Sequence, residues 1–230
     1  MITIYQGNTH LLESSDINIV IDVIRAFTVA HYAFINGTKQ ILLVETTEDA
    51  FSIKNEYPHY LLAGEEDGIG IKGFDYDNSP KRISKERLND QTLVQKTTNG
   101  VKATLNSLNT NHLFVTGYSN ARTTAFYVKK IYNASLENLK INIVASHPSG
   151  DDDLACAEYM KGLILEKNNL TPFEVEQRIK NSHVAHKFFD PNNIDFNCED
   201  ISLCSLERES NFVMKVNQSN QIPVIERINI

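Results

Sequence analysis

The sequence has little cysteine, and the cysteines form no pattern. Three occur among 230 residues, an odd number, and no two have the C-x-x-C spacing. This usage is typical of reduced thiols inside a cell, packed as small hydrophobic residues. The three residues are Cys156, Cys198 and Cys204.

The sequence also lacks long apolar runs and an excess of basic charge. No stretch is apolar for long enough to span a bilayer, and residues 1–5 lack the basic flank and apolar core of a signal peptide. We therefore expect a cytoplasmic protein with no membrane partner. The net charge of −7 argues against a nucleic-acid partner, which requires a basic footprint. A small anion can still bind where a local pocket is basic.

No Pro/Gly/Ser-rich or like-charged tract marks a linker, and apolar residues are spread evenly along the chain. We therefore predict one domain covering residues 1–230, which is long enough to bury a substantial core. The sequence leaves open whether the chain forms a homo-oligomer. It also leaves open whether the region after Asn168 covers the site or packs on a second subunit.

Residues 17–28 have the clearest pattern in the chain, and they predict a central strand followed by the start of a helix. Residues 17–23 are a β-branched apolar run, typical of a strand covered on both faces. A helix is predicted over 26–35 and a second strand over 39–44, which together predict a βαβ unit and a partly parallel sheet. Further strands and helices alternate to residue 165, and the proline in 222–225 favours an edge strand there. The fold class predicted is α/β.

Asp22 and Arg25 follow the strand over 17–23, where the rim of the ligand crevice lies in an open α/β sheet. They are therefore candidates for chemistry. The alternative is an internal Asp22–Arg25 ion pair that pins the turn, because structural ion pairs imitate active sites in sequence.

Small polar residues also follow other strands. The turns at 97–100 and 117–120 place hydroxyl and amide groups at predicted helix starts, where free N–H groups bind phosphate or only cap the helix. Three aspartates, 151–153, begin another helix and fit either capping or a Mg²⁺ site.

Common phosphatase and hydrolase signatures are missing. The chain contains no G-x-x-x-x-G-K-[ST], no H-E-x-x-H, no G-x-S-x-G, and no cysteine followed six positions later by arginine. Ile24 stands where a haloacid-dehalogenase-type site has its second acid.

Six short motifs nevertheless resemble, in register, those of the 2-phosphosulfolactate phosphatase family. They are IDVIRAFT (21–28), AGE (63–65), GFDYDNSP (73–80), TTNG (97–100), NA (120–121) and DD (152–153) ahead of CA (156–157). The resemblance implies a three-layer α/β/α fold with a largely parallel or mixed central sheet. It also implies a Mg²⁺-dependent phosphoric monoester hydrolase that acts on a small anionic phosphorylated substrate, 2-phospho-3-sulfolactate.

Carried onto this sequence, the resemblance implies a set of site residues. Asp22, Glu65 and Asp153 are expected to hold Mg²⁺, and Arg25 to bind phosphate with its guanidinium. Asp75 is expected to be a further metal ligand or a base, and whether water or a carboxylate attacks stays open. The residues expected to bind substrate are Asn78, Ser79, Thr97, Thr98, Asn99, Gly100 and Asn120.

The chain departs from the family pattern at several positions. Glu66 replaces an arginine and Asp77 a glycine, which disfavours a sulfonated ligand, while Lys96 replaces a threonine and restores positive charge. Phe27 and Asp152 are further departures. Two alternatives follow: a hydrolase of the same fold acting on a non-sulfonated phosphate ester, and a non-catalytic anion-binding protein.

Overall fold

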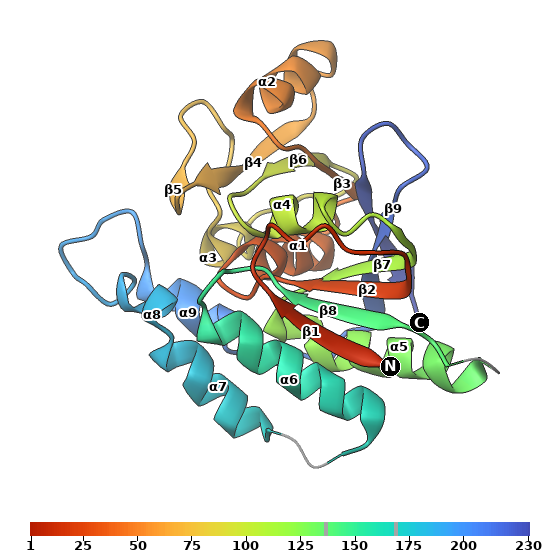
Figure 1. The fold of residues 1–230 in the computed structure, drawn as a ribbon. Coiled ribbons are helices and arrows are strands. Elements are labelled where there is room, and N and C mark those ends of the chain that lie inside the picture. The colour runs from red at the N-terminus through yellow and green to blue at the C-terminus, as the bar shows by residue number, and fades with distance from the viewer. Residues whose placement is uncertain (136–137, 168–169) are drawn as a thin grey trace.

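The computed structural model describes residues 1–135, 138–167 and 170–230, so Asn168 lies outside the described residues. The strands of this part form one mixed sheet (Figure 1). They are β1 (Ile2–Gln6), β2 (Ser15–Ile21), β3 (Gln40–Leu43), β4 (Leu61–Glu66), β5 (Ile69–Gly70), β6 (Thr92–Lys96), β7 (Thr110–Thr116), β8 (Ile141–Ala145), β9 (Phe212–Asn217) and β10 (Val224–Asn229). Their order in the sheet is β1-β8-β2-β7-β9-β10-β3-β6-β4-β5.

Helices cover both faces of this sheet, which confirms the layered α/β/α fold (Figure 1). They are α1 (Ala26–Ile35), α2 (Thr47–Glu56), α3 (Pro80–Ile83), α4 (Gly100–Leu105), the 3₁₀ helix η1 (Tyr118–Asn120), α5 (Ala121–Ala134), α6 (Asp151–Leu165), α7 (Pro172–Asn181), α8 (His183–His186) and α9 (Cys198–Cys204). Helices α5, α6 and α7 pack on one face, and α1, α3 and α4 pack on the other. In the described part of the chain, no helix has the length and apolar character needed to cross a membrane.

Strand β2 is buried on both faces, as its β-branched run predicts. Ile17, Ile19 and Ile21 point into the core formed with α5 and α6, whereas Val20 points into the core around α1. This division follows from the two-residue period of a strand. Because two helix layers flank β2, its carboxyl end is held rigidly and positions Asp22.

The predicted βαβ unit is not formed by neighbouring strands. β2 and β3 are separated in the sheet by β7, β9 and β10, and the last two run antiparallel to each other. Short connections favour adjacent strands but do not require adjacency, and here the C-terminal strands take the intervening places. The sheet is therefore mixed, with parallel pairs on each side of the β9–β10 hairpin.

The prediction of an edge strand at 222–225 is wrong. β10 pairs with β9 on one side and with β3 on the other. Pro223 precedes the strand, so it removes no N–H from the ladder, and its carbonyl accepts a hydrogen bond of 2.9 Å from Leu43 N. No strand was predicted over 212–217, although β9 lies inside the sheet.

Several helices begin directly after a capping residue. Thr46, Ser79 and Thr171 each accept a hydrogen bond from the first turn of the helix that follows, and Thr171 forms a full capping box with Glu174. Helix α6 begins at Asp151, so the three aspartates 151–153 form its first turn, as expected from the sequence.

We predict that β9 contributes to the core despite its polar surroundings. Met214 is fully buried beside α1, so Met214→Ala should lower the free energy of unfolding by about 2–5 kcal/mol. Urea unfolding followed by circular dichroism measures this. Ile194→Ala is the control, since Ile194 is 94% exposed and its truncation should change stability by less than about 0.5 kcal/mol. Equal effects of the two changes would contradict the position of β9.

Candidate active site

A cavity of about 400 Å³ lies where the ends of β2, β4 and β6 meet. Asp22 follows β2, Glu65 lies near the end of β4, and Thr98 follows β6. The segment around α8 supplies a further wall, which includes Lys187 and Phe188. The cavity therefore collects polar residues from the strand ends and closes them with the C-terminal part of the chain.

Asp22 is buried and holds the turn between β2 and α1. Its Oδ1 accepts a hydrogen bond of 2.8 Å from Ala26 N, and Gly100 N donates to the same carboxylate. Burial raises the pKa of Asp22 to about 7, and the charges of Glu65 and Asp152 add to this rise. A Cβ on Gly100 would lie 2.7 Å from Asp22 Oδ2, so only glycine lets α4 approach this closely.

Glu65 is held by three donors. Its Oε1 accepts from Thr98 N at 2.6 Å, and its Oε2 accepts from Gly68 N at 2.5 Å and from Thr98 Oγ1 at 3.0 Å. These bonds link the end of β4 to the turn after β6 and fix the carboxylate at the cavity wall.

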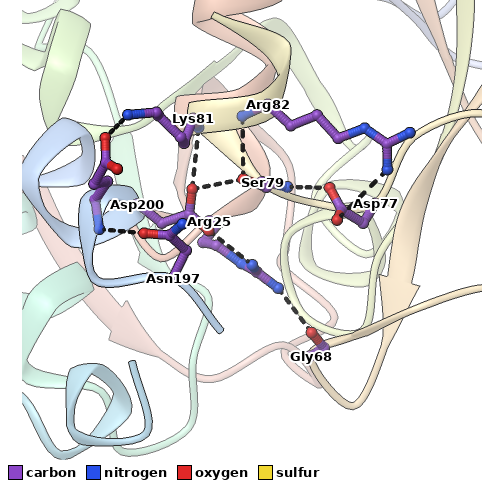
Figure 2. Close-up of polar contacts among 9 residues, drawn as sticks. Arg25, Gly68, Asp77, Ser79, Lys81, Arg82, Asn197 and Asp200 are labelled. Carbon is purple, nitrogen blue, oxygen red and sulfur yellow. Dashed lines mark hydrogen bonds and ion pairs between the residues drawn. The ribbon is translucent and has the colours of Figure 1, made fainter. Parts of the chain in front are cut away.

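Arg25 also lines the cavity, but its hydrogen bonds go to other parts of the chain. Its Nη1 is 3.0 Å from Asp200 Oδ2, and its Nη2 donates to Gly68 O at 2.7 Å (Figure 2). The guanidinium also lies over the rings of Phe188 and Phe196, 5.0 and 5.4 Å from their centroids. The ion pair of Arg25 is therefore with Asp200, and the Asp22–Arg25 pair that the sequence left open is not formed.

Asp200 joins three parts of the chain and was not predicted from the sequence. Besides Arg25, it accepts hydrogen bonds through Oδ1 from Ser79 Oγ at 2.6 Å and from Lys81 N at 3.0 Å (Figure 2). It lies in the first turn of α9, whose start is capped by Asn197. An asparagine with acids two and three positions later, here Glu199 and Asp200, is a helix-start pattern, and that pattern was the available signal.

Asp153 does not line the cavity. Its Oδ1 accepts from Val23 N at 2.7 Å, and its Oδ2 accepts from Ser146 Oγ and His147 N at 3.0 and 2.9 Å. Burial and the charges of Asp152 and Asp22 raise its pKa. These contacts fasten α6 to the exits of β2 and β8 beside the site.

The other predicted residues divide into two groups. Asn78, Thr98 and Asn99 line the cavity, and Asn78 Oδ1 is buried without a hydrogen-bond partner in the described structure. The remaining residues hold secondary structure together: Asp75 accepts from Leu62 N and Lys54 Nζ, Ser79 caps α3, Thr97 accepts from Val101 N, Gly100 packs on Asp22, and Asn120 accepts from Thr116 Oγ1.

Three of the departures from the family pattern, Glu66, Lys96 and Asp77, lie beside a group of opposite charge. Lys96 Nζ lies 3.2 Å from Glu66 Oε1, so its charge is directed to Glu66. Asp77 accepts from Ser79 N and lies 3.8 Å from Arg82 Nη1 (Figure 2). Neither Glu66 nor Asp77 lines the cavity.

Comparisons with known proteins give the family of the chain. Residues 4–219 match the sequence profile of the 2-phosphosulpholactate phosphatase family. The chain belongs to this family. The expected family is thus confirmed, and with it the enzyme class, a phosphoric monoester hydrolase.

Two family members show how far the similarity extends. A probable 2-phosphosulfolactate phosphatase of Bacillus subtilis is 59% identical over 227 residues, which cover 99% of this chain and 98% of the relative. One of Caldicellulosiruptor saccharolyticus is 33% identical over 180 residues, which cover 76% of this chain and 74% of the relative.

Among the residues lining the cavity that were not predicted from the sequence are His147 and Lys187. His147 follows β8, and its Nδ1 accepts a hydrogen bond of 3.2 Å from Ser149 N. Burial and the nearby charges of His183 and Lys187 lower the pKa of His147. Lys187 follows α8, in a polar stretch with no motif.

The carboxylates fit a divalent cation only in part. Within residues 1–135, 138–167 and 170–230, no three His, Cys, Asp or Glu side chains are grouped as a metal site. Asp22 and Glu65 both line the cavity, and the charge of Glu65 raises the pKa of Asp22. Two carboxylates suffice for Mg²⁺ when phosphate oxygens and water complete its shell.

We predict that Asp200→Asn destabilises the protein by about 3–5 kcal/mol, because it leaves the buried Arg25 charge unpaired. Urea unfolding at neutral pH measures the change. The matched control is Glu199→Gln, the adjacent residue, whose ion pair with Lys81 is half-exposed and should contribute less than about 1 kcal/mol. A similar loss in both variants would show that the buried pair has no special role.

We also predict that Asp22 makes stability depend on pH. Because its pKa is about 7 in the fold against 3.8 for the free group, its favourable contribution is lost as the pH rises from about 4 to about 7. Asp22→Asn removes this contribution, so the variant should become more stable relative to the wild type between pH 5 and pH 8. Urea unfolding in metal-free buffer tests this, and parallel pH profiles would contradict it.

Proposed function

We propose that this protein is a Mg²⁺-dependent phosphatase that hydrolyses the phosphate ester of 2-phospho-3-sulfolactate. Membership of the family supports the reaction and the substrate class. The arrangement of Asp22 and Glu65 supports the metal.

The observation that carries the proposal is the pair of carboxylates at the cavity wall. Asp22 is buried, and its pKa of about 7 reflects burial together with the charge of Glu65. A divalent cation relieves both effects, since it neutralises two carboxylates that repel each other. We assign Asp22 and Glu65 to Mg²⁺, which when bound reduces the charge on the phosphoryl oxygens. Asp153 lies outside the cavity, so we assign it to the support of the site.

Other side chains bind and orient the substrate. Arg25 places a fixed positive charge at the cavity wall, because Asp200 and Gly68 O hold its guanidinium. The amide of Asn78 offers an oxygen without a partner, which can accept a hydrogen bond from water or from a protonated phosphate. Since His147 Nδ1 accepts a hydrogen bond, the neutral ring carries its proton on Nε2 and can donate it to an oxygen.

The two acidic departures from the family pattern do not oppose a substrate with several acidic groups. Glu66 and Asp77, which suggested a non-sulfonated ligand, are paired with Lys96 and Arg82 and do not line the cavity. Their repulsion of a sulfonate is therefore weak, and the substrate of the family remains the one proposed.

We place the activity in the cytoplasm. Cys156 and Cys204 are buried free thiols and Cys198 is an exposed one, a state that a reducing compartment maintains.

The test is phosphate release from 2-phospho-3-sulfolactate and from non-sulfonated phosphorylated hydroxy acids, with and without Mg²⁺. We expect Mg²⁺-dependent release that prefers the sulfonated substrate. Asp22→Asn should lower kcat/KM by on the order of 10²–10³-fold, and calorimetry should show weaker Mg²⁺ binding. Glu48→Gln, an exposed carboxylate of α2, is the control and should change neither.

Three results would contradict the proposal. Phosphate release that is equally fast without Mg²⁺ would show that the reaction does not need the metal. Release from non-sulfonated esters alone would favour the alternative substrate class. No release by the folded protein, together with tight binding of inorganic phosphate, would favour an anion-binding protein.

A further inference from the structure

Lys187 is a cation on the cavity wall that no motif includes. It follows α8 and is half-buried among the residues that close the cavity, with Val184, Phe188 and Phe196. Its Nζ lies 4.4 Å from the centroid of the Phe196 ring. A Cβ built on Gly68 would be 2.8 Å from the same Nζ, so the ammonium reaches across to the loop after β4.

The ammonium of Lys187 has no carboxylate partner. In the described parts of the chain, it forms no ion pair, and it lies over the rings of Phe196 and Phe188. Arg25 differs, since it is paired with Asp200 and also donates to Gly68 O. In the described residues, therefore, all three donors of the Lys187 ammonium remain available to a ligand.

The surroundings of Lys187 favour a bound anion. Burial and the charge of Arg25 lower its pKa, while Glu65 and Asp67 oppose this effect. Two cations thus lie near each other at a partly dehydrated wall. An acidic ligand group placed between them and solvent would stabilise the charged form of the lysine.

The segment that carries Lys187 is fastened at both ends by buried polar contacts. Ser182, which precedes α8, donates from its Oγ to Asp152 Oδ1 at 2.9 Å. Asp200, which lies in α9, is paired with Arg25. The lysine is therefore presented from a fixed backbone, which lowers the entropy lost when a ligand binds.

We propose that Lys187 binds the non-reacting sulfonate of the substrate and so determines its specificity, an inference that rests on the proposed phosphatase function. The phosphate is the stronger ligand for a hard cation held by Asp22 and Glu65, so it takes that end of the cavity. The sulfonate carries a single charge next to a methylene group. The ammonium of Lys187 suits the charge, and the rings of Phe188 and Phe196 beside it suit the methylene group.

The experiment compares two substrates that differ only in this group, 2-phospho-3-sulfolactate and 2-phospholactate. For Lys187→Gln we expect kcat/KM for the sulfonated substrate to fall by about tenfold or more, with less than about a twofold change for 2-phospholactate. Lys187→Arg keeps the charge and should retain most of the preference. Lys161→Gln on α6 makes the same charge change at a similarly exposed lysine outside the cavity and should leave the preference unchanged.

A binding measurement separates this inference from the proposed function. Calorimetry with sulfolactate and with inorganic phosphate should show weaker binding of sulfolactate alone in Lys187→Gln. If the wild type hydrolyses neither substrate, the proposed function fails, and sulfolactate binding alone then decides the role of Lys187. Equal losses for both substrates, or unchanged sulfolactate binding, would overturn the assignment.

Discussion

The site depends on the buried ion pair between Arg25 and Asp200, two residues 175 positions apart in the chain. Both side chains are almost inaccessible, at 4% and 1% exposed, so neither charge is stabilised by bulk water. A buried pair of this kind contributes little net stability compared with apolar packing, but the loss of one partner is costly. Its structural effect is positional: it connects the turn after β2 to α9, and through Ser79 it connects α9 to α3 (Figure 2). The wall that carries Lys187 lies between these fixed points.

Beside this pair, the carboxylates of Asp22, Asp152 and Asp153 are buried close together, and burial raises the pKa of each. The fold tolerates them because backbone and hydroxyl donors are directed at their oxygens. Asp152 and Asp153 use these bonds to anchor α6 and the segment that begins at Ser182. Asp22 is the member of the three that lines the cavity, so it connects the anchored cluster to the ligand.

Much of the fold follows from local patterns. The β-branched run of β2 and the capping residues Thr46 and Thr171 have physical effects within a few residues, and the structure has the elements they predict. β9 has no such signal. Its place in the sheet is set by pairing with β7, which is distant in the chain, and with β10, which follows it. The same distinction applies to the site. The motifs identify Asp22 and Glu65 but cannot show that Asp75 binds Leu62 N, or that Arg25 is paired with Asp200.

A motif specifies residue types and not the direction in which a charge points. The sequence gives Glu66 and Lys96 as separate departures, one unfavourable and one favourable to an anionic ligand, yet each neutralises the other beside the cavity. The net charge offered to a ligand is therefore set by cations outside the motifs. Arg25 is paired with Asp200, so Lys187 is, in the described residues, the cavity cation without a carboxylate at ion-pair distance, and it lies in the part of the chain with the weakest sequence pattern. The strand ends supply residues for phosphate chemistry, and the C-terminal segment supplies the charge that distinguishes one phosphorylated acid from another.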